Sequence, residues 1–286
     1  SLSLLKRENS LQEGDPLDFV LKKKELVYSP KPLVAIPTTA GTGAEATHFA
    51  VVYAGKTKYS LTHPFILPKY SIIDPQFTFS LPAKITASTG MDALAQAIES
   101  YWSNRSTEES KKYAQEAILL IMPNLSIAVN NPTPETRTAM ARGAHFAGKA
   151  INISFTTACH AISYPITSYF GVPHGHAVAL TLPSMILFNG EVDEASVSDS
   201  RGLDYVKSMM QELFGLLGVA DGREGKEKIE KLLQDIHLET KISDLGVRTD
   251  KDVGLIIENG FNPERVKNNP RLLAAHDLRS ILKALL

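Results

Sequence analysis

The spacing of hydrophobic positions divides the chain into two parts. In roughly the first 85 residues, short runs of β-branched and aromatic side chains are separated by Gly, Pro and polar turns, which is typical of strands. These runs predict strands at residues 33–36, 49–53, 58–61 and 70–73. After Pro82, apolar side chains recur every three or four residues, as on one face of a helix. The first such stripe comprises Met91, Leu94, Ala95, Ile98, Tyr101 and Trp102.

Local signals predict where several helices begin. A capping box is expected at residues 106–109, where Ser106 stands three residues before Glu109. Pro134 is placed to open the next helix in its first turn. The remaining helical patterns cover residues 176–189, 204–218, 225–237, 249–259 and 276–285.

Composition and charge narrow the class of protein. The 286 residues are 43% hydrophobic and 21% charged, which is enough to bury a large core. No apolar run has the length of a membrane span and residues 1–10 lack the pattern of a secretory signal, so we expect a cytoplasmic protein. A net charge of -1 with interspersed signs indicates neither a nucleic-acid partner nor a membrane surface, and a small-molecule substrate is expected.

The single cysteine, Cys159, excludes an intrachain disulfide framework and a cysteine-rich zinc module. Any metal ligands must therefore be His, Asp or Glu. Asp92 and Gln96 lie four residues apart and share a helix face, although Asp92 could instead cap a helix. His160 and His174 are 14 residues apart, with Pro173 placing His174 in a predicted turn. Two such imidazoles can converge on one cation, but isolated histidines are more often ordinary, partly buried side chains.

Residues 37–45, PTTAGTGAE, directly follow an apolar strand. The hydroxyls of Thr38 and Thr39 and the glycines Gly41 and Gly43 would let backbone and side chains approach a polyanion closely. A flexible connection between a strand and a turn is an equally good interpretation of this segment.

Taken together, these segments resemble the iron-containing, or group III, alcohol dehydrogenases. The resemblance is carried by PTTAGTGAEAT, by GMDAL and AIESY in the first helix, by ACHAISYPITSYFGVPHGHAVAL and by NNPR at residues 268–271. It implies a dehydroquinate synthase-like architecture, in which a nucleotide-binding domain adjoins a helical domain that holds a divalent metal. It also implies NAD or NADP as cofactor and iron or zinc as metal. Asp92, His160 and His174 fall on the metal-ligand positions of the family.

The chain departs from the family pattern in two places. Gln96 stands where the family usually has His, and a carboxamide oxygen is a poorer ligand than imidazole, so Gln96 is a doubtful fourth ligand. The glycine-rich stretch that wraps the cofactor pyrophosphate is not found, so we expect an N-terminally truncated protein. Residues 1–84 would be the C-terminal part of the nucleotide-binding α/β domain, and residues 85–286 the all-α metal and substrate domain. Lys58, with Thr38 and Thr39, matches positions that touch the cofactor in relatives.

A narrower resemblance concerns the substrate. Residues 47–53, 96–103 and 148–152 are similar to the branch that reduces phosphonoacetaldehyde to 2-hydroxyethylphosphonate. His145, Lys149 and Asn152 form a polar stripe on an otherwise small and apolar helix, and such a stripe predicts an anionic or polar partner unless it is solvated. Tyr164, one helical turn after His160, would line the nicotinamide pocket or pack in the core.

We therefore expect hydride transfer between nicotinamide and a carbonyl carbon, with a metal held by Asp92, His160 and His174 as Lewis acid. Alternatives are a dehydroquinate synthase-like or glycerol dehydrogenase-like enzyme that uses metal and NAD, and a catalytically silent fragment. A homodimer is compatible with the sequence, which does not fix the oligomeric state.

Overall fold

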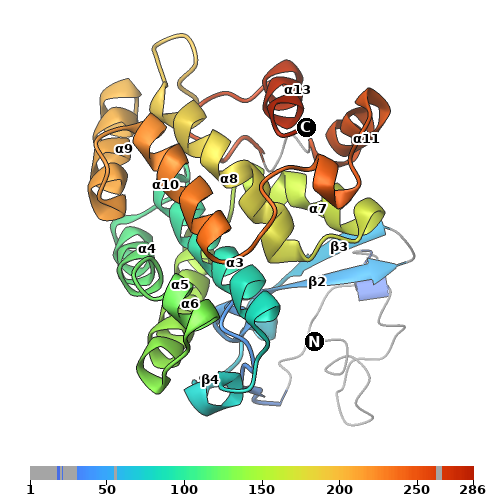
Figure 1. Cartoon of the computed structure of the whole chain (residues 1–286). Helices are drawn as coiled ribbons and strands as arrows, with labels where there is room; N and C mark the ends of the chain where they lie inside the picture. Colours follow the sequence, from blue (N-terminus) through green and yellow to red (C-terminus); the bar gives the residue numbers. More distant parts are fainter. Residues whose placement is uncertain (1–17, 20, 22–30, 55–56, 262–265) are drawn as a thin grey trace.

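The computed structural model describes residues 18–19, 21, 31–54, 57–261 and 266–286. Within this part, the strands lie in the first 75 residues and pair in two small sheets (Figure 1). Strand β1 (Val34–Ala35) pairs in parallel with β4 (Tyr70–Ser71). Strand β2 (Phe49–Ala54) pairs antiparallel with β3 (Thr57–Thr62). All four predicted strands are therefore present, although β1 and β4 are shorter than expected.

Short 3-10 turns follow β1, β3 and β4, and the described chain after η3 consists of helices joined by loops. The turns are η1 (Ala44–Ala46), η2 (Pro64–Ile66) and η3 (Pro75–Thr78). The helices that follow are α3 (Ala83–Trp102), α4 (Glu108–Ile121), α5 (Leu125–Asn130), α6 (Pro134–Ser154), α7 (Ala158–Phe170), α8 (His174–Gly190), α9 (Leu203–Leu217), α10 (Gly222–Asp235), η4 (Ser243–Leu245), α11 (Asp250–Gly260) and α13 (Ala275–Ala284).

Helix α3 runs through the middle of the helical part, with α4, α5 and α6 packed on one side and α8 on another (Figure 1). Its sequence is rich in Ala, Ser and apolar residues, and nearly every residue from Thr86 to Trp102 is buried. A helix that is buried all round can carry polar side chains into the interior only where they find partners. The polar residues of α3 are therefore the first place to look for a site.

Two of the predicted helix starts can be compared with the structure. Pro134 is the first residue of α6, as expected, and Thr133 caps this helix. At α4 the expected box is displaced by one residue: Thr107 is the N-cap and exchanges hydrogen bonds with Ser110. The predicted cap, Ser106, is engaged elsewhere, because its hydroxyl and carbonyl oxygens accept hydrogen bonds from Arg201.

The predicted fold class, a small α/β part followed by an all-α part, is confirmed. The change from strands to helices falls between η3 and the start of α3 at Ala83. A division into two domains near residue 84 stays a prediction. None of the helices in the described ranges combines the length and the apolar character needed to cross a membrane.

Candidate metal centre

Asp92 lies in the middle of α3, so the interpretation of this residue as a helix cap is wrong. Only 3% of its surface is exposed. Gln96 and Glu99 follow one and two helical turns later on the same face and are also buried. A buried carboxylate in the middle of a helix needs partners from other elements.

Two histidines from separate helices provide these partners. His160 of α7 places Nε2 3.2 Å from Asp92 Oδ1, and His174, the first residue of α8, places Nε2 3.8 Å from the same oxygen. One ligand atom from each of Asp92, His160 and His174 lies within 4.8 Å of the other two. The structure thus brings together the three residues that the sequence indicated as metal ligands.

A glycine makes the approach of His174 possible. A Cβ atom on Gly175 would lie 1.9 Å from the Ser88 carbonyl oxygen and 2.9 Å from Asp92 Cβ, so only glycine lets the start of α8 touch α3. The expectation that His174 lies in a turn is wrong, because α8 begins at this residue. Pro and Gly around a histidine favour a turn locally, but here the close helix contact requires the glycine.

Glu99 belongs to the same cluster and was not indicated as a site residue by the sequence. It is fully buried and accepts hydrogen bonds from Thr157 Oγ1 at 2.8 Å and from the Cys159 backbone N–H at 2.7 Å. It also bonds to Nδ1 of His160, which leaves Nε2 facing Asp92. Metal-binding histidines are commonly oriented by a carboxylate on their other nitrogen. The signal was present in the sequence, since Glu99 follows Asp92 by two helical turns.

The charges of this cluster reinforce one another. Burial alone would lower the pKa of His160, but the carboxylates of Glu99 and Asp92 raise it to about 9. Burial alone would raise the pKa of Asp92, but the hydrogen bond from His160 and the charges of His174 and His160 leave it below its usual value. A cation bound to these atoms would take the place of the His160 proton.

Gln96 provides an independent indication that a ligand belongs here. Its Nε2 donates to the Thr42 carbonyl oxygen at 3.4 Å, whereas its buried Oε1 has no hydrogen-bond partner in the described part of the chain. An unpaired buried acceptor is unfavourable, and a cation beside it would remove the penalty. Two imidazoles, one carboxylate and one amide oxygen form a donor set that fits iron or zinc.

These groups face a cavity of about 740 Å³ between the strand-rich part and the helices. Asp92, Gln96, His160 and His174 all line it. Tyr164 lines it too, and its ring stacks on that of His174 with centroids 5.9 Å apart. Contact of Tyr164 with a nicotinamide ring stays a prediction.

The residues of the polar stripe on α6 are not among the described lining residues of this cavity, and their binding of the substrate stays a prediction. His145 pairs with Glu45 at 3.1 Å. The ammonium of Lys149 lies 3.9 Å from the centroid of the Tyr113 ring, and Asn152 Oδ1 accepts the backbone N–H of His48 at 2.8 Å. A stripe on one helix shows which side chains share a face, but not which neighbouring element covers that face. Here α4, η1 and the residue before β2 cover it.

The loop that precedes η1 contains the residues expected at the cofactor. Gly43 has φ +60°, and a Cβ atom there would lie 2.4 Å from Gly148 Cα on α6. A Cβ atom on Gly41 would lie 2.7 Å from Thr89 Cβ on α3. Close packing of the loop on two helices therefore explains both glycines. Thr38 is exposed and Thr39 half-buried. Lys58 lies on β3, with its side chain outside the described part, and a cofactor role for all five residues stays a prediction.

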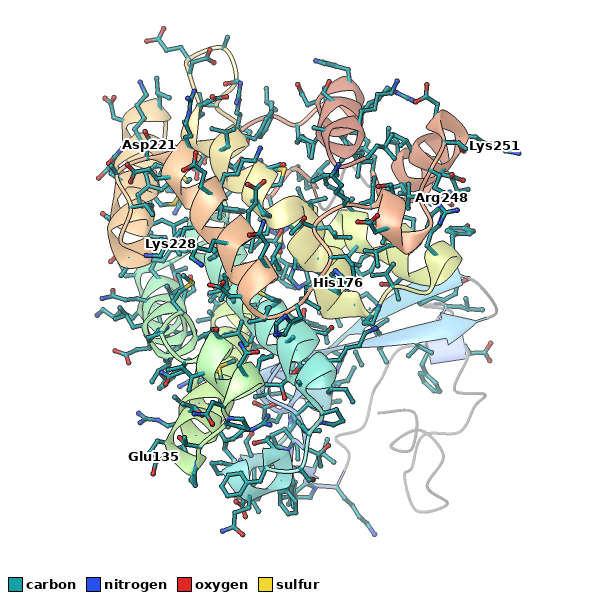
Figure 2. All side chains as sticks on the ribbon, viewed as in Figure 1. Glu135, His176, Asp221, Lys228, Arg248 and Lys251 are labelled. Carbon is teal, nitrogen blue, oxygen red and sulfur yellow. The ribbon has the colours of Figure 1, made fainter. Side chains whose placement is uncertain are left out.

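His176 has a different role from its neighbour His174. It lies inside the helical layers, whereas the labelled Glu135 and Lys251 project from the surface (Figure 2). Its Nε2 donates to the Glu239 carbonyl oxygen at 2.8 Å, and burial lowers its pKa. His176 thus joins α8 to the segment after α10.

Comparisons with known proteins point in the same direction as the geometry. Residues 86–286 match the family model described as the C-terminal part of the Fe-containing alcohol dehydrogenase family, and residues 6–75 match the model described as iron-containing alcohol dehydrogenase. Over 194 residues the chain is 39% identical to phosphonoacetaldehyde reductase of Streptomyces viridochromogenes, covering 67% of this chain and 49% of that protein. Over 256 residues it is 30% identical to NAD-dependent methanol dehydrogenase of Bacillus methanolicus, covering 88% of this chain and 65% of that protein.

The chain thus spans between about half and two thirds of the length of these two relatives. Among solved structures, sulfoacetaldehyde reductase from Bifidobacterium kashiwanohense, in complex with NAD+, has a TM-score of 0.85 at 31% identity. That superposition covers 96% of this chain and 70% of the other. The similarity extends over both the strand-rich and the helical parts.

Proposed function

Because the chain belongs to the iron-containing alcohol dehydrogenase family, we propose that it carries the metal site of an NAD(P)-linked alcohol dehydrogenase or aldehyde reductase. The observation that carries the proposal is the convergence of Asp92, His160 and His174 from three helices at the wall of one cavity. Gln96, with its unpaired buried oxygen, adds a donor beside them.

Each residue of the cluster has a distinct role in the proposal. Asp92, His160 and His174 would hold iron or zinc, with Gln96 Oε1 as a weaker fourth donor. Glu99 would keep His160 protonated on Nδ1, so that the Nε2 lone pair remains available to the metal. Three strong protein ligands leave a coordination position for a substrate oxygen.

When bound, the metal would polarise the carbonyl oxygen of the substrate and the reduced nicotinamide would supply the hydride. The chain itself orients the reactants and excludes water. Phe49, Ile151 and Phe155 give the cavity apolar walls. Such walls strengthen the electrostatic contacts inside the cavity by lowering the local dielectric constant. Tyr164 stacks on His174 and limits the rotation of its ring.

The cofactor contacts proposed for this chain lie on the loop before η1 and on β3. Thr38, Thr39, Gly41 and Gly43 would contact the dinucleotide, and Lys58 a ribose or phosphate. Thr42 of this loop and Ala44, the first residue of η1, line the cavity, which supports proximity of the loop to a bound nicotinamide. Both NAD and NADP are compatible with these residues.

We assign a short anionic aldehyde as substrate, with reduction of phosphonoacetaldehyde to 2-hydroxyethylphosphonate as the first reaction to test. Two separate comparisons support this class. The Streptomyces relative is a phosphonoacetaldehyde reductase, and the Bifidobacterium structure is a sulfoacetaldehyde reductase. Both names describe a two-carbon aldehyde with an oxyanion group on the carbon next to the carbonyl.

The proposed function is tested by following NADH and NADPH oxidation with phosphonoacetaldehyde before and after a chelator removes the metal. We expect the rate to disappear with the metal and to return when Fe²⁺ or Zn²⁺ is added back. A protein that reduces the aldehyde equally fast without bound metal would contradict the proposal. Propanal in place of phosphonoacetaldehyde separates the general activity from the choice of substrate.

A further inference from the structure

Apart from the histidines of the candidate metal centre, one basic side chain lies among the described lining residues of the cavity. Asp92 is the one carboxylate in this lining and Arg105 is the one Lys or Arg. Arg105 lies in the loop between α3 and α4. Phe155 and Asn268, from other parts of the chain, also line the cavity. The candidate metal ligands and one guanidinium group therefore line the same cavity.

The backbone around Arg105 is held firmly on both sides. The Arg105 N–H donates to Ser103 Oγ at 3.1 Å, and Ser103 Oγ–H donates to the Ser154 carbonyl oxygen at 2.9 Å. The N–H of the neighbouring Asn104 donates to the Asn268 carbonyl oxygen at 2.9 Å. Ser103 is fully buried. These bonds fix the base of the Arg105 side chain beside the cavity.

Phe155 provides a platform for the guanidinium group. The Arg105 Cζ atom lies 5.2 Å from the centroid of the Phe155 ring, which itself stacks on Phe49 at 5.8 Å. Phe155 has φ +59° and ψ 175°, a region that residues other than glycine rarely adopt. Strained backbone of this kind persists where the surroundings impose it and is concentrated at functional sites. Here the strained backbone of Phe155 ends α6 and leaves its aromatic ring beneath the Arg105 guanidinium group.

The guanidinium N–H groups of Arg105 have no hydrogen-bond acceptor within the described ranges, and the guanidinium lies over the Phe155 ring. Other arginines differ. Arg201 pairs with Asp199 at 2.6 Å, and Arg137 donates to Thr86 Oγ1 at 2.6 Å. A planar guanidinium presents paired donors that match two oxygens of a phosphonate or sulfonate group.

We infer that Arg105 binds the anionic group of the substrate, with the aldehyde oxygen directed toward Asp92, His160 and His174. This inference rests on the proposed function, and it replaces Lys149, which lies over Tyr113 outside the cavity. Arg105 is a specificity-determining residue: it recognises the oxyanion and takes no part in hydride transfer. Phosphonate and sulfonate share this chemistry, so both aldehydes are substrates of the same site.

The first experiment measures kcat/KM of the wild type and of Arg105→Met with phosphonoacetaldehyde, sulfoacetaldehyde and propanal. We expect a loss of roughly 10- to 100-fold on both anionic aldehydes and less than about twofold on propanal. Arg105→Lys should lie between, because an ammonium keeps the charge but loses the paired donors. The control is Arg142→Met, an exposed arginine on α6 that does not line the cavity. Equal losses on all three aldehydes, or no loss on the anionic ones, would overturn the inference.

A second experiment does not depend on activity. Calorimetric titration measures the affinity of the protein for 2-hydroxyethylphosphonate and 2-hydroxyethanesulfonate, with 1-propanol as the neutral control. Arg105→Met should weaken binding of both anions by at least about tenfold and leave the binding of 1-propanol unchanged. If wild type and Arg105→Met bind the anions equally, or if neither binds, the inference is wrong. If Arg105 is needed for anion binding but no aldehyde is reduced, the inference stands and the proposed function fails.

Discussion

His160 on α7 and His145 on α6 each contact a buried carboxylate, but the two histidine–carboxylate pairs differ in the residues that surround them. His160 contacts Glu99 through one ring nitrogen and Asp92 through the other, and a second histidine approaches the same Asp92 oxygen. His145 contacts Glu45 at 3.1 Å. Among the described residues, no third His, Cys, Asp or Glu joins that pair within ligand distance.

The contrast shows that residue type and helix face do not identify a site by themselves. The His160 cluster forms where α3, α7 and the start of α8 converge. The His145 pair closes the junction of α6 with η1, where Gly43 and Gly148 bring the backbones together. In the His160 cluster, the candidate ligand atoms of three residues lie close together. In the His145 pair, the polar atoms of the two side chains contact each other and join α6 to η1.

The largest expected effect comes from removing the shared carboxylate. Asp92→Asn keeps the side-chain volume but removes the charge, so bound metal should fall from about one ion per chain to below about 0.1. Metal content after dialysis, measured by mass spectrometry, checks this. The matched control is Glu45→Gln, which alters the other histidine–carboxylate pair and should leave the metal content unchanged. Equal metal content in the Asp92 variant and the wild type would show that the site is elsewhere.

The next effect concerns the residue behind His160. Glu99→Gln should weaken metal binding by roughly 10- to 100-fold, because His160 loses the carboxylate that orients it. The dissociation constant for Zn²⁺, measured by competition with a chelating dye, is the readout. Glu212→Gln is the control, since Glu212 accepts a hydrogen bond from Tyr101 of α3 but does not line the cavity. A fall in melting temperature with no change in metal affinity would assign Glu99 a purely structural role.

Gly175 tests whether the contact between helices builds the site. Gly175→Ala would place a methyl group 1.9 Å from the Ser88 carbonyl oxygen, so α8 must shift away from α3. We expect a destabilisation of about 1–3 kcal/mol and roughly tenfold weaker metal binding. Gly254→Ala, in α11 with open space around it, should be neutral or stabilising by up to about 1 kcal/mol. Thermal unfolding measures the stability of both variants, and metal titration measures their metal affinity. If Gly175→Ala bound metal as tightly as the wild type, the close contact between α8 and α3 would not be needed for the site.

Gln96 should contribute less than the other ligands. Gln96→Ala removes one amide oxygen, which is worth about 1 kcal/mol or roughly fivefold in metal affinity. The same dye competition measures it. A loss as large as that of Asp92→Asn would mean that Gln96 is a full ligand and that the cluster holds the metal differently.

The smallest effect is expected in the contrasting region of α6. Lys149→Met should change kcat/KM by less than about twofold on anionic and neutral aldehydes alike, because Lys149 contacts Tyr113 rather than the cavity. A selective loss on phosphonoacetaldehyde would instead restore Lys149 as the receptor for the anion.

The hydrophobic period located most helices, because burial of one helix face imposes it locally. The four strands were located by short runs of β-branched and aromatic residues between turn residues. The resemblance to a family indicated Asp92, His160 and His174, and the structure brings them together. The roles of Glu99 and Gly175 depend on which helix lies opposite, and one helix pattern does not contain that information. For the same reason, the stripe of His145, Lys149 and Asn152 did not show that Lys149 faces Tyr113 of α4.

The most direct test of the central claim is a crystal structure of the protein loaded with Zn²⁺ or Fe²⁺, with diffraction data collected at the absorption edge of the metal. We expect one strong anomalous peak within about 2.0–2.3 Å of Asp92 Oδ1 and of Nε2 of both His160 and His174. A peak at another position, or a metal-loaded crystal with no peak between these three residues, would contradict it.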